Sequence, residues 1–223
     1  MKRERKTLNL TLRYRSGCGS YEEFCQEAEK LSASTRSVMN LGTCLLYTFL
    51  LQEKTEDDVI TEYGCYPETV IYHTYRDKYP NLSIASFSAA IHTCHQRFRA
   101  DEERFREGTK SIPTYKAGQP ILLRQSSVKI TWDENRYYAS IGLFSKEYTI
   151  SHGYHRVLFD IDANDERTDE LLSGIARGTL RAGESRLIYD KEQECWKLLI
   201  AYLPASSIPE STISRKLPYQ LSF

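Results

Sequence analysis

The sequence lacks three features that would assign it to a broad class of protein: a surplus of one charge, a long hydrophobic segment and a paired-cysteine motif. Lys plus Arg and Asp plus Glu each number 30 among 223 residues, so composition alone indicates neither a nucleic-acid nor a membrane partner. The longest apolar stretch, residues 41–52, is shorter than the ~20 residues of a membrane span and includes Thr43 and Thr48. We expect a core helix there and no membrane contact.

The six cysteines form no Cys-x-x-Cys pair, and no apolar signal segment follows the basic start MKRERK. An oxidising compartment is therefore not indicated. We expect a cytoplasmic protein whose cysteines are buried free thiols. The six positions are Cys18, Cys25, Cys44, Cys65, Cys94 and Cys195.

Motifs for several enzyme classes are also missing. No Gly-x-Ser-x-Gly elbow and no phosphate-binding loop occurs, which leaves serine hydrolases and nucleotide triphosphatases without support. SGCGS at 16–20 resembles a dinucleotide-binding turn, but Glu22 occupies its third glycine position. We interpret it as a glycine turn that leads into a capped helix, and we predict no cofactor.

The first half of the chain predicts one strand followed by helices. Residues 7–14 alternate between large apolar and polar side chains, which is typical of a half-buried strand. Ser20 and Glu23 form a capping-box pattern, Pro67 starts a further helix and Ser83 caps another. Three or four helices are therefore expected before the next strand.

The second half predicts mainly β structure. Glycine and proline punctuate residues 108–120, and alternating apolar patterns follow. We expect strands at 128–132, 135–144 and 156–161, a short helix near 168–177, and a hairpin within 185–204.

These elements predict an α+β fold in which the first strand joins an antiparallel sheet or barrel formed by the second half, with the helices inserted between them. The expected units are residues 1–15 with 112–205 for the barrel and residues 16–111 for the helices. From residue 206 onward the sequence has no period, and we expect a loose tail.

Two groups of residues invite a metal-site hypothesis. DIDAND at 160–165 follows a strand, but Asp165 and Leu171 stand where a calcium loop requires Gly and Glu. Histidine pairs occur in HTCH at 92–95 and HGYH at 152–155, yet the ligands of the first cannot all face one way on a helix. We favour a polar loop that caps the next helix, and surface histidines.

Basic residues near the middle of the chain are regularly spaced. Arg97 with Arg104, and Arg99 with Arg106, are close to two helical turns apart, and basic residues continue toward the strands. The continuing residues are Lys110, Lys116, Arg124 and Lys129. Acidic residues at 101–103 and 107 lie among them, so a nucleic-acid path and a solvated, salt-bridged helix both stay open.

Four segments, taken in order, carry a family resemblance: YPNLSIASFSAAIHTCHQRFRADEERF, IPTYKAGQPILLRQSSVKI, RYYASIGLFS and LLSGIARGTLRAGESRLIYDKEQECWKLLIAY. Over about residues 7–203 the chain resembles the N-terminal half of TnpB-like transposon-encoded nucleases and of the related compact type V CRISPR effectors. The resemblance implies a wedge-type β-barrel with an inserted helical recognition lobe. It also implies guide RNA and target DNA as partners.

The resemblance further implies which residues contact nucleic acid. Lys116 and Arg124 would contact phosphates, and Gln125, Ser126 and Ser127 would position or recognise a base edge. Near the start of the recognition helix, the residues expected to approach the DNA motif beside the target are Ser83, Ser86 and Ser88. From the basic path we add Arg97, Arg104 and Lys129.

One departure from the family concerns catalysis. In the family a RuvC nuclease follows the barrel, with a catalytic Asp in a Gly-[Val/Ile]-Asp-x-Gly setting, and a zinc ribbon comes later, whereas here AYLP precedes a short aperiodic tail. We expect a nucleic-acid-binding module that is not itself an enzyme, with a homodimer or a separate nuclease subunit left open. The alternatives are a protein-interaction domain and, ranked last, a metal-dependent hydrolase using Asp160, Asp162 and the histidines.

Overall fold

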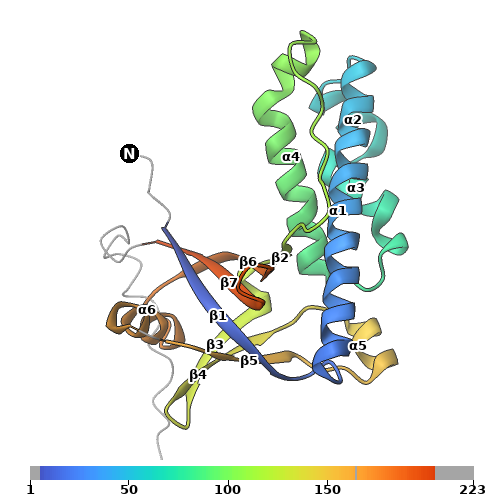
Figure 1. The fold of residues 1–223 in the computed structure, drawn as a ribbon. Helices are drawn as coiled ribbons and strands as arrows, with labels where there is room; N and C mark the ends of the chain where they lie inside the picture. The colour runs from blue at the N-terminus through green and yellow to red at the C-terminus, as the bar shows by residue number, and fades with distance from the viewer. Residues whose placement is uncertain (1–5, 164, 204–223) are drawn as a thin grey trace, which may run out of the picture.

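The computed structural model describes residues 6–163 and 165–203 (Figure 1). The strands are β1 (Lys6–Ser16), β2 (Ile121–Leu123), β3 (Val128–Asp133), β4 (Arg136–Ile141), β5 (Val157–Ile161), β6 (Ala182–Asp190) and β7 (Cys195–Tyr202). The α-helices are α1 (Tyr21–Leu51), α2 (Glu56–Tyr63), α3 (Pro67–Tyr75), α4 (Ile84–Arg106), α5 (Lys146–His152) and α6 (Glu166–Ala176). The tail predicted from residue 206 and Asn164 of the acidic loop lie outside the described residues.

All seven strands belong to one antiparallel sheet in the order β2-β6-β7-β1-β5-β4-β3. β1 lies in the middle, between β5 and β7, and its Leu8, Leu10 and Leu12 are buried. The prediction that the first strand joins the strands of the second half is therefore confirmed, as is the α+β fold class.

The sheet is curled into a half-barrel because its two outermost strands are joined by a short link. The four residues Arg124–Ser127 connect β2 to β3 and can span at most about 18 Å. In a flat seven-stranded sheet the outer strands would lie about 29 Å apart. We call this link the seam; its last three residues form a 3₁₀ turn.

Helices α1 and α4 stand side by side at the β2 end of the sheet, with α2 and α3 beside them, while α6 lies at the other end (Figure 1). After α4 the chain turns at Gly108, and residues 109–120 run back along α1 and α4 to β2 (Figure 1). The basic segment singled out in the sequence therefore lies on the helices before it enters the sheet.

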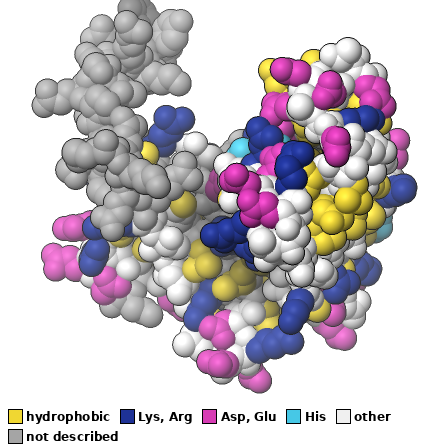
Figure 2. Space-filling model, turned by 90° about the horizontal axis from the view of Figure 1, so that it is seen from above, with side chains coloured by type: hydrophobic (Ala, Val, Ile, Leu, Met, Phe, Trp, Pro, Cys, Tyr) yellow, Lys and Arg dark blue, Asp and Glu magenta, His cyan; other side chains and the backbone are white. Residues whose placement is uncertain are grey.

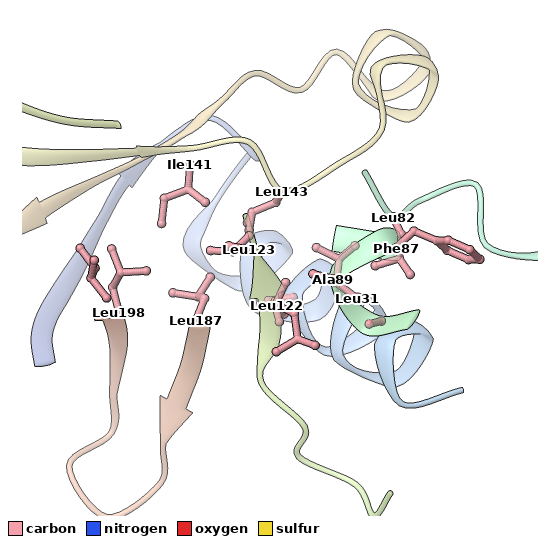
Figure 3. Packing of buried hydrophobic residues seen from close by; sticks show 14 of the residues in the cluster. Leu31, Leu82, Phe87, Ala89, Leu122, Leu123, Ile141, Leu143, Leu187 and Leu198 are labelled. Carbon is pink, nitrogen blue, oxygen red and sulfur yellow. The ribbon is translucent and has the colours of Figure 1, made fainter. Parts of the chain in front are cut away.

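One hydrophobic core joins the helices to the sheet, and β2 lies at the junction. Leu123 lies toward Ile141 and Leu187 inside the half-barrel, whereas Leu122 lies toward Leu31 and neighbouring helical residues (Figure 3). Adjacent side chains of a strand point to opposite faces, so this short strand packs against both layers. The two parts thus share one core.

Local sequence signals explain how most elements begin. Ser20 and Glu23 form the predicted capping box of α1, and the side chain of Asp165 accepts a hydrogen bond from Thr168 N at the start of α6. The SGCGS turn has positive φ at Gly17 and Gly19, as the glycine-turn interpretation predicted.

Three elements, α2, β2 and α5, were missed and one was predicted too long. β2 has only three residues, and because all three are apolar and buried, it shows no alternation of apolar and polar side chains. α5 has seven residues between a Ser145 cap and Gly153, which is too short for an apolar period to show. The strand predicted at 135–144 ends at Ile141, after which the amide of Gly142 donates to Ser127 O of the seam at 2.8 Å.

The apolar stretch at 41–52 forms the C-terminal part of α1, and a core role is confirmed for it by buried Leu46, Phe49 and Leu50. Within residues 6–163 and 165–203, no helix combines the length and the hydropathy that crossing a bilayer would require.

The cysteines differ in accessibility, which corrects the prediction that all are buried. Cys18 and Cys94 are fully buried, and burial raises the pKa of these thiols to about 11 and about 12. Cys44 is exposed.

Because the thiolate is the reactive form, we expect iodoacetamide to label Cys44 first and Cys18 and Cys94 only on unfolding, measured by peptide mass spectrometry. Equal labelling of all three in the native protein would contradict this packing.

Candidate functional site

A cleft of about 960 Å³ lies between α4 and the sheet. Three parts of the chain line it: α4, the seam, and the paired ends of β6 and β7. We call it the cleft. It brings together three of the residues predicted from the sequence, Arg124, Gln125 and Ser126, which are all exposed.

On the helix side, the cleft is lined by a polar stripe. His92 and Gln96 of α4 face it, and a smaller hollow of about 250 Å³ continues from His92 and Arg124 to Ser88. Ser88, His92 and Gln96 are four residues apart, so they share one face of the helix. The predicted Ser88 thus borders the same region as the predicted seam residues.

The electrostatic character of the cleft is positive on balance. Arg124 and Arg181 line it together with one carboxylate, that of Glu184. Across the two described ranges, none of the ion pairs involves Arg124 or Arg181, and both side chains are exposed. Guanidinium groups without a carboxylate partner can bind phosphate oxygens in a bidentate manner.

The seam is held in place by Arg156, which the sequence reasoning did not single out. Its Nη2 donates to Ser127 O at 2.8 Å and to Ser140 O at 2.7 Å, and its Nε donates to the Ser140 hydroxyl at 2.9 Å. Three bonds from one planar group fix the seam against β4, so Gln125 and Ser126 are presented by a rigid turn. Ser127 is different: it is buried, which corrects its prediction as a contact residue.

The basic segment before β2 is fastened to α1. Asn40 accepts a hydrogen bond from Tyr115 N at 2.8 Å and donates to Tyr115 O at 3.1 Å, and Ser32 donates to Gln119 O at 2.6 Å. Between these anchors the predicted Lys116 is exposed. Arg97 lies over the Tyr115 ring at 5.5 Å, and burial raises the pKa of Tyr115.

Replacing Asn40 with alanine is expected to release this segment locally. Both bonds to Tyr115 would be lost, at a cost of about 1–3 kcal/mol because a buried amide and a carbonyl are left unpaired. Hydrogen exchange should accelerate at residues 111–120 and stay unchanged in the sheet. Ser37→Ala, on the same helix, is the control; faster exchange everywhere in Asn40→Ala would contradict a local anchoring role.

Two of the serines predicted to contact DNA, Ser83 and Ser86, form hydrogen bonds within the protein. Ser83 caps α4 by accepting from Ser86 N at 3.1 Å, and its hydroxyl donates to the Ser86 hydroxyl at 2.9 Å. Ser86 is fully buried, so the prediction that it contacts a ligand is wrong for this structure. The sequence also predicted that Ser83 caps this helix. A hydroxyl that caps a helix is less free to contact a ligand, so the capping pattern itself could have argued against a DNA contact.

The basic path along α4 is interrupted by carboxylates. Arg104 lies 3.6 Å from Asp101, and Arg99 and Arg106 both pair with Glu102. Figure 2, which looks down on the helical end, shows Lys and Arg side chains beside Asp and Glu over this face. From Arg99 to Arg106, α4 therefore fits the solvated, salt-bridged helix better than a continuous nucleic-acid path. Such exposed pairs are weak, so they do not prevent binding.

Lys129 lies apart from the cleft-lining residues. It is exposed on β3, opposite Ser140 in the register with β4. The structure brings together Ser88, Arg124, Gln125 and Ser126, and it leaves Lys129 on the outer strand of the sheet.

Three residues of the metal-site alternative, Asp160, Asp162 and His95, lie in ion pairs. Asp162 pairs with Arg13, Asp160 lies 3.9 Å from Arg15, and His95 lies 2.6 Å from Glu68. Among residues 6–163 and 165–203, no three His, Cys, Asp or Glu side chains are grouped so that they could hold a metal ion. The acidic loop instead caps α6, as the sequence indicated.

Among the cleft residues that sequence reasoning missed, four have charged, amide or imidazole side chains: His92, Gln96, Arg181 and Glu184. The four-residue spacing of Ser88, His92 and Gln96 is a signal that could have found the first two. Arg181 and Glu184 lie at the start of β6 and reach the cleft because β6 pairs with β2, the strand that was missed.

Comparisons of the sequence and of the fold with known proteins find similarity to Cas12f proteins. No model of a known protein family matches the sequence. The CRISPR-associated endodeoxyribonuclease Cas12f1 of Sulfoacidibacillus thermotolerans is 24% identical in an alignment 198 residues long, and the match covers 82% of this chain and 45% of that protein. The chain thus spans less than half the length of this curated relative.

Two solved structures share the fold. A Cas12f1–sgRNA–target DNA complex matches 90% of this chain and 58% of its own chain, with a TM-score of 0.62 and 11% identity. A CRISPR–Cas12f ternary complex matches 85% and 42%, with a TM-score of 0.59 and 13% identity. These similarities confirm the predicted resemblance to part of a compact type V effector.

Proposed function

We propose that this chain, which is similar to part of a compact type V CRISPR effector, binds guide RNA and target DNA as the recognition and wedge portion of such an effector. The observation that carries the proposal is the cleft. There the seam and the start of β6 present two arginines without a carboxylate partner among the described residues, beside amide and hydroxyl groups of the seam and of α4.

In this proposal the groups of the cleft have separate roles. Arg124 and Arg181 bind phosphates, with Lys116 extending the contact along the basic segment. Gln125 and Ser126 position or recognise a base edge, because an amide offers both a donor and an acceptor. Residues 16–111 would act as the recognition lobe, and residues 1–15 with 112–205 as the wedge barrel.

The proposal is tested by sequencing the RNA that co-purifies with the chain from its native host, against a mock purification. One enriched structured RNA is the expected result. Ribosomal and transfer RNA background alone would overturn the proposal and would favour the protein-interaction alternative.

We also propose that this chain does not cut DNA by itself. The sequence contains no Gly-[Val/Ile]-Asp-x-Gly segment of the kind that carries a catalytic Asp in the family it resembles. Incubation of the purified chain with its co-purified RNA, matching DNA and Mg²⁺ should leave the DNA intact. Cleavage that tracks with the chain through purification would refute this part.

A further inference from the structure

A second site lies at the opposite end of β3 from the seam, around an exposed tryptophan. Trp132 is 52% exposed, whereas Trp196, the other tryptophan of the sequence, is 7% exposed. Trp132 belongs to β3, the outermost strand of the sheet, near the turn to β4 (Figure 1). One exposed aromatic ring is common on protein surfaces, but this ring borders a pocket.

Two adjoining hollows, of about 250 and about 470 Å³, share Trp132, Tyr137 and Asp169. Arg177, the C-cap residue of α6, lines the first, and Arg136, the first residue of β4, lines the second. We call the pair the hairpin pocket. The volume of the larger hollow lies in the range of about 300–1,000 Å³ that is usual for small-molecule sites.

One wall of the hairpin pocket is rigid. Tyr137 stands directly opposite Trp132 in the β3–β4 register, with ring centroids 4.5 Å apart. Tyr137 is buried, and its hydroxyl donates to the backbone oxygen of Asp169 at 3.3 Å, which ties the sheet to α6. A fixed neighbour restricts the indole before binding, so less conformational entropy is lost when a ligand stacks on it.

Two of the carboxylates that border the larger hollow are already matched by cations. Asp162 pairs with Arg13, and Asp160 lies 3.9 Å from Arg15. Asp169 lines both hollows and is exposed. The Asp169 carboxylate is therefore the unpaired hydrogen-bond acceptor that borders the pocket together with the Trp132 indole.

The cations of the hairpin pocket outnumber this carboxylate. Arg136 and Arg177 are exposed, and in the described part of the chain no ion pair involves either. Asp133 and Glu134 of the turn are also exposed but do not line the pocket. Arg13, Asp160 and Asp162 also line the pocket. Beside the aromatic face, the pocket groups that take part in no ion pair among the described residues are therefore two guanidinium groups and one carboxylate.

We propose that the hairpin pocket binds a single unpaired nucleotide, with its base stacked on Trp132 and its phosphate held by Arg136 or Arg177. Asp169 then accepts a hydrogen bond from an amino or imino group on the base edge, as carboxylates do with nucleobases. The proposal rests on the nucleic-acid-binding function and extends it to a site separate from the cleft.

The chemistry selects an unpaired nucleotide over a duplex. In a duplex both faces of each base are covered by neighbouring bases, so an indole has no face to stack on. Unpaired bases stack on aromatic side chains and arginine planes with little dependence on sequence. A bare phosphate would use the arginines but leave Trp132 untouched, which separates a nucleotide from an anion in experiments.

Trp132 supplies its own signal for the test. Adenosine and guanosine monophosphate are expected to quench the tryptophan emission of the whole chain saturably, and ribose 5-phosphate is expected to leave it unchanged. Trp132→Phe should abolish the quenching. Absent quenching, or equal quenching by ribose 5-phosphate, would overturn the proposal.

A second measurement separates this site from the cleft. In an Arg124→Glu, Arg181→Glu background, a labelled single-stranded RNA pentamer should lose affinity about tenfold or more on Trp132→Ala, and Trp132→Phe should lose much less. Tyr66→Ala, which removes another exposed aromatic ring, is the matched control. Quenching that persists in this background supports the hairpin pocket even if the cleft proposal fails. Unchanged affinity in Trp132→Ala would refute the hairpin pocket alone.

Discussion

Replacing Arg124 and Arg181 together with glutamate is expected to weaken nucleic-acid binding by at least about tenfold at moderate salt. Both guanidinium groups line the cleft, and reversing their charge turns two phosphate contacts into repulsions. Because each cation that neutralises a phosphate contributes about 0.9 to the slope of log affinity against log salt, that slope should fall by about two. Anisotropy of a labelled duplex and of an RNA–DNA hybrid, titrated at several salt concentrations, measures both quantities.

The control for this variant changes the net charge equally but outside the cleft. Lys146 and Lys191 are exposed, on α5 and on the β6–β7 turn, and neither lines the cleft. Lys146→Glu with Lys191→Glu should lower affinity far less and leave the salt slope nearly unchanged. Equal losses in the two double variants would show that total charge, and not the cleft, governs binding.

Replacing Gly17 with alanine is expected to destabilise the protein by about 3 kcal/mol or more. Gly17 has φ of +113°, and a Cβ there would lie 2.5 Å from Arg156 O and 2.8 Å from Val157 Cα. Strain from positive φ and overpacking against backbone each cost about 1–3 kcal/mol. For a chain of this size the melting temperature should fall by about 10 °C.

Gly64→Ala is the matched comparison, since Gly64 also has positive φ, +73°, but a Cβ there would meet nothing within 4 Å. It should cost only about 1–2 kcal/mol, the penalty of a left-handed conformation. The difference between the free energies of unfolding of the two variants, measured by chemical denaturation, gives the cost of the clash at Gly17 alone. If both lost the same stability, the close approach of Gly17 to β5 would be wrong.

Elements with a strong local signal were predictable from the sequence. β1 alternates, α1 carries a capping box, α3 begins with proline, and the β6–β7 hairpin places Trp196 and Leu198 on one buried face. β2 and α5 were not predictable, because three buried residues and a seven-residue helix contain too little sequence for a period. Their existence depends on tertiary packing.

The candidate site was predictable only where its residues lie close together in the chain. Arg124, Gln125 and Ser126 lie in one continuous segment that the family resemblance covers, and the resemblance implied their contacts. Arg181 comes to the same cleft through strand pairing, and no local pattern reports such pairing. Arg104 was selected by its helical spacing, and the sequence did not show that its guanidinium lies 3.6 Å from the carboxylate of Asp101.

The seam has a consequence for how this protein can be altered. Its four residues bridge the outer strands of a curled sheet, and Ser127 O accepts bonds from Gly142 N and from Arg156. An inserted residue would change the register of both strands or open the half-barrel. An exchanged side chain at Gln125 or Ser126 would do neither. The seam therefore tolerates exchanged side chains but not a change in length, and a library that varies Gln125 and Ser126 to test the proposed base contact should keep the number of residues fixed.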